Sequence, residues 1–217
     1  MSKIILDICG GTGSWSKPYK ENGYDVKIIT LPDHDITDVE VQDWLISLKP
    51  HGILAAPPCT MFSLARNDKT ARLPRDMRSG LDVVNSCLRV VHECYFDKFR
   101  KNDSYLKFWC IENPASGYLN RFLGNPYYKF NPCDHGDPYT KKTALWGMFN
   151  IPKRNYIEPR DITHSSGAKD FVSIVEHFAD LKQIPDGYCD KTGYSKRKVM
   201  RSMTPYGFSK AFYEANK

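Results

Sequence analysis

The chain has 217 residues, of which 41% are hydrophobic, and a formal net charge of +6. This length is enough for one well-formed core and lies near the upper end for a single domain. No apolar run approaches the ~20 residues that a membrane-spanning helix needs, and the N-terminus lacks the pattern of a secretory signal. The seven cysteines are scattered, and no pair has the spacing of a zinc knuckle. These features predict a reduced, cytoplasmic protein with no metal and no membrane segment.

Strand and helix patterns alternate along the first half of the chain. Residues 3–8 form a short apolar run that ends at a glycine-rich turn beginning with Cys9, as expected for a buried strand. The alternation predicts an α/β fold with a doubly wound, mostly parallel sheet. The second half is rich in proline, glycine and aromatic residues, and we interpret it as a loop-rich insertion on this sheet. Further strands are expected at 24–31, 52–56, 106–111 and 144–149, and helices at 14–22, 38–48 and 79–99.

Three polar clusters follow predicted strands, where open α/β sheets bind their ligands. The first spans Cys9 to Ser14, the second Pro57 to Ser63, and the third is Glu112-Asn113-Pro114. Each of the three clusters could have a purely structural role instead of a functional one. The glycines could form a plain tight turn, Cys59 could be a buried filler rather than a thiolate nucleophile, and Glu112 could be a loop cap rather than a tuned acid. The residues alone leave the choice for Glu112 open.

The clusters, in this order, resemble the DNA cytosine-5 methyltransferase family, and in particular its compact phage-type members. The segment from Pro57 to Ser63, Pro-Pro-Cys-Thr-Met-Phe-Ser, resembles the family's nucleophile loop. Glu112-Asn113 resembles its Glu-Asn-Val element, with Pro114 in place of valine. Asp76-x-Arg78-x-x-Leu81 resembles a further motif at the start of a long helix. The resemblance implies a Rossmann-like methyltransferase fold and spans most of the chain.

The resemblance also implies S-adenosyl-L-methionine as the cofactor. The glycine loop would lie under the methionine part, an Asp-Ile segment would contact the adenine, and a late Gly-Phe-Ser element would pack back against the cofactor. Asp33 is the nearest candidate for the acidic residue that binds the ribose. The implied cofactor residues are Asp7, Cys9, Gly10, Gly11, Thr12, Gly13, Ser14, Trp15, Asp35, Ile36, Pro57, Phe208 and Ser209.

The implied reaction is methylation of carbon 5 of a cytosine in DNA. Cys59 would add to carbon 6, and Glu112 would bind ring nitrogen 3 and the exocyclic amine. The family's Gln-x-Arg-x-Arg element is replaced by Tyr-Thr-Lys-Lys-Thr, in which Lys141 aligns with the first arginine and Thr143 with the second. Lysine supplies the charge of an arginine but not its planar fork. The implied catalytic residues are thus Cys59, Glu112 and Lys141, and the implied substrate-binding residues are Pro58, Ser63, Asn113 and Thr143.

The resemblance also implies a division of the chain into three parts. Residues 1–147 would form the catalytic and cofactor-binding domain, 148–200 a reduced substrate-recognition region, and 201–217 a segment that packs back on the first part. The basic run from Lys191 to Arg201 could contact phosphates, but on the sequence alone we favour the simpler interpretation, a solvated face. Two alternatives remain open: modification of a cytosine in RNA or a free nucleotide, and an idle regulator that binds S-adenosylmethionine or nucleic acid without turnover.

Overall fold

The computed structural model describes residues 2–64, 74–100, 105–159 and 184–217. Its centre is one six-stranded sheet in which the first four strands run parallel and the sixth runs antiparallel to the fourth and fifth. The predicted α/β class with a mostly parallel sheet is therefore confirmed. The strands are β1 (Ile4–Ile8), β2 (Asp25–Ile29), β3 (Gly52–Ala55), β4 (Phe108–Pro114), β5 (Tyr128–Phe130) and β6 (Thr143–Met148), in the spatial order β2-β1-β3-β4-β6-β5.

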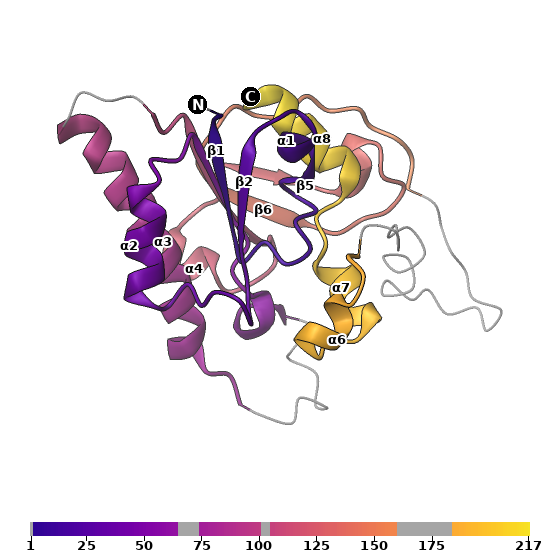
Figure 1. Cartoon of the computed structure of the whole chain (residues 1–217). Coiled ribbons are helices and arrows are strands. Elements are labelled where there is room, and N and C mark those ends of the chain that lie inside the picture. Colours follow the sequence, from indigo (N-terminus) through magenta and orange to yellow (C-terminus); the bar gives the residue numbers. More distant parts are fainter. Residues whose placement is uncertain (1, 65–73, 101–104, 160–183) are drawn as a thin grey trace.

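Helices cover both faces of the sheet (Figure 1). Successive strand residues point to opposite faces, so Leu6 and Ile53 join the core under α2 and α3, whereas Ile5 and Leu54 join the aromatic core under α1 and α8. The helices are α1 (Lys17–Glu21), α2 (Val39–Ser47), α3 (Met77–Arg100), α4 (Asn120–Leu123), α6 (Tyr188–Thr192), α7 (Lys196–Ser202) and α8 (Tyr206–Ala215), with 3₁₀ turns η1 (Cys59–Met61) and η3 (Pro132–His135).

The predicted elements of the first half all occur, with shifted ends. The helix expected at 14–22 begins only at Lys17, because the preceding residues form the turns of the glycine loop. The strand expected at 106–111 runs to Pro114, since β6 pairs with it over six residues. β5 was not predicted, and neither were the short helices α6 and α7. Residues 160–183 of the expected substrate-recognition region lie outside the described residues.

The C-terminal segment lies against the start of the chain (Figure 1). The backbone N–H of Thr204 donates a hydrogen bond to the Ser14 hydroxyl over 2.9 Å. Trp15 contacts Phe208 and Phe212 in the aromatic core, with ring centroids 6.1 Å and 5.5 Å away. The glycine loop is therefore held between β1 and the segment that leads into α8.

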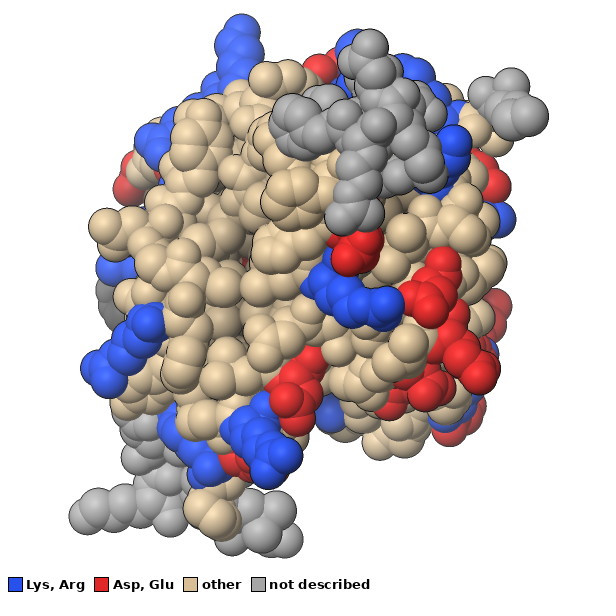
Figure 2. Space-filling model, turned by 90° about the vertical axis from the view of Figure 1, so that its left-hand side faces the viewer, with Lys and Arg blue, Asp and Glu red and all other residues tan. Residues whose placement is uncertain are grey.

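Charged side chains of both signs are scattered over the face that carries α2 and α3, with acidic ones gathered toward its right-hand side (Figure 2). Exposed basic side chains also lie on α7, where Lys196, Arg197, Lys198 and Arg201 surround the buried Val199 and Met200. In the described ranges, no helix is long and apolar enough to cross a membrane, and no group of three histidine, cysteine or acidic side chains is arranged to hold a metal ion.

Candidate functional site

The register of the sheet brings the polar clusters to one edge. Ile8 pairs with Ala55, and Ala55 pairs with Ile111. The next residue of each parallel strand, Glu112 among them, therefore lies at the carboxyl edge, which is where ligands bind in sheets of this type. β6 runs the opposite way and pairs with β4 as far as Thr143 and Pro114. The segment that carries Lys141 consequently enters the sheet at the same edge.

The loop that carries Cys59 is fixed to two strands. The Asn113 side-chain amide donates a hydrogen bond to the Pro57 carbonyl over 2.9 Å, and the Ala56 N–H donates to the Ile8 carbonyl over 2.9 Å. Cys59 then begins η1, and the fully buried Phe62 anchors its far end. Asn113 was expected to contact substrate, and here its amide nitrogen positions the loop that carries Cys59.

Charged groups surround the Cys59 thiol. The residue is exposed, but the protein around it still removes water from the thiol. This desolvation, followed by the negative charge of Glu112, raises the pKa of Cys59, whereas the positive charges of Lys141 and Arg201 lower it. The four side chains therefore form one electrostatic cluster, in which two cations favour the thiolate.

Glu112 is only partly exposed, and its carboxyl group feels the same lysine. Burial raises the pKa of Glu112, and the Lys141 ammonium lowers it part of the way back. A carboxyl with a raised pKa keeps a larger protonated fraction near neutral pH, and only the protonated form can donate a hydrogen bond. The arrangement therefore combines a cysteine, a candidate acid and a cation at one sheet edge.

Lys141 is held by the segment that follows α7. Its ammonium donates hydrogen bonds to the carbonyls of Arg201, over 3.1 Å, and Met203, over 3.5 Å. Thr143 is buried, and its hydroxyl donates to the Lys141 carbonyl over 2.8 Å. Arg201 was not predicted as a site residue. Its only sequence signal is its place at the end of the basic run, which does not indicate which member turns toward the cysteine.

Removing the positive charge of Lys141 tests this electrostatic cluster. We expect Lys141→Met, and to a smaller extent Arg201→Gln, to raise the pKa of the Cys59 thiol, because each loses a cation that stabilises the thiolate. The pH dependence of iodoacetamide alkylation, followed at the Cys59 peptide by mass spectrometry, measures that pKa. Lys142→Met is the matched control, since the exposed Lys142 is not among the charges that act on the thiol. An unchanged alkylation profile in Lys141→Met would contradict the cluster.

The glycine loop forms a cradle beside this cluster. A Cβ atom at Gly10 would lie 2.5 Å from the Asp7 carboxyl carbon, so only glycine fits there. Gly11 has a φ of +56°, and the space beside it is open except for the Tyr188 hydroxyl, 3.5 Å from the position of a Cβ. The Thr12 hydroxyl and the Trp15 indole N–H are buried without a hydrogen-bond partner among the described residues. Open backbone with unsatisfied polar atoms suits a ligand that lies on the loop.

The remaining predicted cofactor residues have structural partners of their own. The Asp35 carboxylate accepts hydrogen bonds from the Thr37 N–H and hydroxyl, over 2.9 Å and 2.8 Å, and Ile36 is buried in the core. Phe208 stacks on Phe130 with ring centroids 3.9 Å apart. Pro57 and Ser209 are also buried. These residues border the loop region, and several of them belong to the core as much as to the crevice.

Burial of Asp7 predicts a measurable effect of pH on stability. Burial raises the pKa of Asp7 to about 6, against about 3.9 in an unfolded chain. Between these values the folded protein binds more protons than the unfolded one, so the free energy of unfolding falls as pH rises from about 4 to about 6, by on the order of 3 kcal/mol. Asp7→Asn keeps an acceptor for the Ser16 hydroxyl and should gain stability relative to the wild type across this window. Urea unfolding at several pH values tests this, and a constant difference between the two proteins would refute it.

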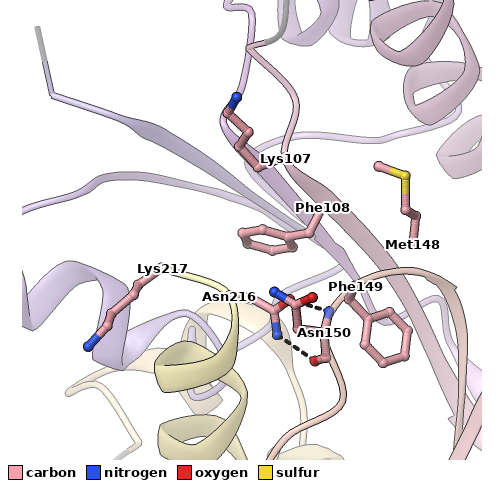
Figure 3. Close-up of a pocket in the computed structure, with 7 residues that line it drawn as sticks. All are labelled: Lys107, Phe108, Met148, Phe149, Asn150, Asn216 and Lys217. Carbon is pink, nitrogen blue, oxygen red and sulfur yellow. Dashed lines mark hydrogen bonds between the residues drawn. The ribbon is translucent and has the colours of Figure 1, made fainter.

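A separate cavity of about 170 Å³ lies at the opposite end of the parallel strands (Figure 3). Its walls include Phe108, Asn150 and Asn216. The Asn216 side chain accepts a hydrogen bond from the Asn150 N–H over 2.7 Å and donates one to the Asn150 carbonyl over 3.0 Å. These bonds tie the C-terminus to the end of β6, so the polar groups here have a structural role and lie far from Cys59.

No protein-family model and no curated protein sequence matches the chain. The functional assignment therefore depends on the residues and geometry described above.

Proposed function

We propose that the protein is an S-adenosylmethionine-dependent methyltransferase that acts on carbon 5 of cytosine in DNA, with a Rossmann-like methyltransferase fold. The observation that carries this proposal is the four-membered electrostatic cluster around Cys59, which includes Glu112 and Lys141, at the carboxyl edge of the sheet. A binding protein needs neither a nucleophile nor a carboxyl group with a raised pKa. The juxtaposition of both favours an enzyme over an idle regulator.

The glycine loop fits the cofactor. The open backbone at Gly11 gives room for a ligand, and the unpartnered Thr12 hydroxyl offers a polar contact in the same loop. Residues of the loop from Cys9 to Ser14 would hold the methionine part, with Asp35 and Ile36 near the adenine. S-adenosylmethionine supplies a methyl group on a positively charged sulfur, which makes that methyl group a strong electrophile.

Cys59 performs the covalent step of the proposed reaction. Carbon 5 of cytosine is a poor nucleophile until a group adds to carbon 6. The Cys59 thiolate donates its electron pair to carbon 6 and forms a carbon–sulfur bond, and the electrons of the 5,6 double bond become available at carbon 5. Lys141 and Arg201 increase the thiolate fraction for this attack. After carbon 5 has been methylated, a base or water removes its proton, the double bond reforms, and the cysteine leaves as a thiolate.

Glu112 stabilises the charge that develops on the ring during this addition. In its protonated form the carboxyl group donates a hydrogen bond to ring nitrogen 3, and its other oxygen accepts one from the exocyclic amine. Thymine lacks that amine and carries a proton on nitrogen 3, so the same contacts select cytosine. In duplex DNA the base must leave the stack first, at a cost of a few kcal/mol.

A mechanism-based trap tests the proposal. The purified protein is incubated with S-adenosylmethionine and an oligonucleotide that carries one 5-fluorocytosine. Fluorine cannot leave carbon 5 as a proton does, so a cytosine-5 enzyme remains bonded to the DNA through its nucleophile. We expect an adduct on a denaturing gel, and peptide mass spectrometry should locate it on Cys59.

Parallel substrates separate the proposal from its alternatives. Trapping by single-stranded or double-stranded DNA supports it, whereas trapping by RNA or by 5-fluoro-dCMP alone assigns the same chemistry to a different substrate. Binding of S-adenosylmethionine with no adduct on any of these substrates favours the idle regulator. Absence of both binding and adduct rejects the methyltransferase altogether.

A further inference from the structure

Helix α6 crosses the carboxyl ends of β1 and β2. The Lys191 ammonium forms an ion pair of 2.5 Å with the Asp33 carboxylate, in the loop that follows β2. The Thr30 side chain lies close to the Tyr188 hydroxyl, and a Cβ atom placed at Gly11 would lie 3.5 Å from that hydroxyl, so Tyr188 bounds the open space beside the glycine loop. In Figure 1, α6 lies at the same end of the sheet as the turn that carries Cys59.

The chain fixes this short helix at both ends. Gly187 and Gly193 both adopt the left-handed conformation, with φ of 72° and 65°, and bracket one helical turn. The Tyr188 N–H donates to the Pro185 carbonyl over 3.1 Å, and the Thr192 hydroxyl donates to the Tyr188 carbonyl over 2.8 Å. Side chains of α6 are therefore presented at defined positions even though the helix is short.

We propose that Tyr188 is a cofactor-binding residue and that α6 forms the outer wall of the nucleoside part of the cofactor site. This inference rests on the proposed function. A ligand that lies on Gly11 must meet the Tyr188 hydroxyl, because that hydroxyl already bounds the open space beside the glycine. The ribose of a bound nucleoside lies near the end of the second strand in sheets of this type. The Tyr188 hydroxyl donates a hydrogen bond to a ribose oxygen there.

Lys191 acts as a positioning residue for the same site. Its ion pair with Asp33 holds α6 over the crevice and orients the carboxylate that was expected to bind the ribose hydroxyls. The pair is about half exposed, so we assign it little stabilising energy of its own. Its role is to fix the places of Tyr188 and Asp33 relative to each other, which lowers the entropy lost when a ligand binds.

Affinity and hydrogen exchange test the assignment in the full-length protein. S-adenosylmethionine affinity is measured by calorimetry, and amide hydrogen exchange of residues 185–193 is compared with and without the ligand. We expect the ligand to slow exchange in α6. Tyr188→Phe should weaken affinity by roughly fivefold, as expected for the loss of one hydrogen bond. Lys191→Met should weaken it by a similar factor, and Lys191→Arg should restore it to within about twofold, since only the charge is needed.

Tyr127→Phe serves as the matched control, because Tyr127 is exposed and its ring contacts Phe149 at the cavity on the opposite end of the parallel strands. If the wild type binds S-adenosylmethionine but Tyr188→Phe binds equally well or more tightly, and α6 exchange does not change, the assignment is overturned while the proposed function stands. If the wild type does not bind S-adenosylmethionine at all, the proposed function fails and this inference fails with it.

Discussion

Cys59→Ala is expected to abolish cytosine modification, with a rate loss of at least about 10⁴-fold, as seen when a covalent nucleophile is removed from an enzyme. Alanine cannot form the bond to carbon 6, and no other group in the charged cluster can replace the thiolate. S-adenosylmethionine binding should be unchanged, because the glycine loop is formed by β1 and the segment before α8. Transfer of a labelled methyl group to a cytosine-containing oligonucleotide measures the rate.

Cys94→Ala provides the matched control for this change. Cys94 is a buried residue of α3, the helix whose first turns lie near η1. Its backbone carbonyl accepts a hydrogen bond from the Tyr105 hydroxyl. Cys94 thus lies toward the other end of that helix, away from the crevice. We expect Cys94→Ala to retain activity to within about threefold. A Cys59→Ala protein that still methylates cytosine at a measurable fraction of the wild-type rate would exclude the covalent mechanism, even if Cys94→Ala behaves as expected.

The edge of the sheet that carries the site could be predicted because its parallel strands could be recognised in the sequence. A buried strand is a short apolar run, and parallel strands bring their carboxyl ends to one edge. The positions of Cys59 and Glu112 after β3 and within β4 follow directly. β5 escaped prediction because its three residues, with Lys129 exposed between Tyr128 and Phe130, are too few to show a periodic pattern.

The partners of the site residues could not be predicted in the same way. Arg201 and Tyr188 come from short helices bounded by glycine and serine, and only tertiary contacts decide what their side chains approach. Lys141 aligned with a family arginine, but its hydrogen bonds to the carbonyls of Arg201 and Met203 join segments sixty residues apart. The sequence therefore indicated the groups that we propose react, whereas the charges placed around them are a property of the fold.

The second large effect is expected for Glu112→Gln. This substitution should make the Cys59 thiol more reactive and should make methyl transfer slower. The negative charge of Glu112 raises the pKa of Cys59, so its removal should lower that pKa and speed alkylation of the thiol at a fixed pH. Glutamine, however, cannot protonate ring nitrogen 3 as a carboxyl group can. We therefore expect methyl transfer to slow by roughly 10²- to 10³-fold, as for the loss of a group that stabilises charge in a transition state.

The pH dependence distinguishes this role from a purely structural one. In the wild type the protonated fraction of Glu112 falls as pH rises through its raised pKa, while the thiolate fraction of Cys59 grows, so the two ionisations oppose each other and give a maximum in kcat/KM. Glutamine does not ionise, and the residual activity of Glu112→Gln should rise with pH until the thiol is fully ionised. Glu93→Gln, at an exposed position of α3, should keep the wild-type profile. If Glu112→Gln instead retains the wild-type rate, or loses activity without faster alkylation, then Glu112 supports the fold of the crevice and does not act on the cytosine ring.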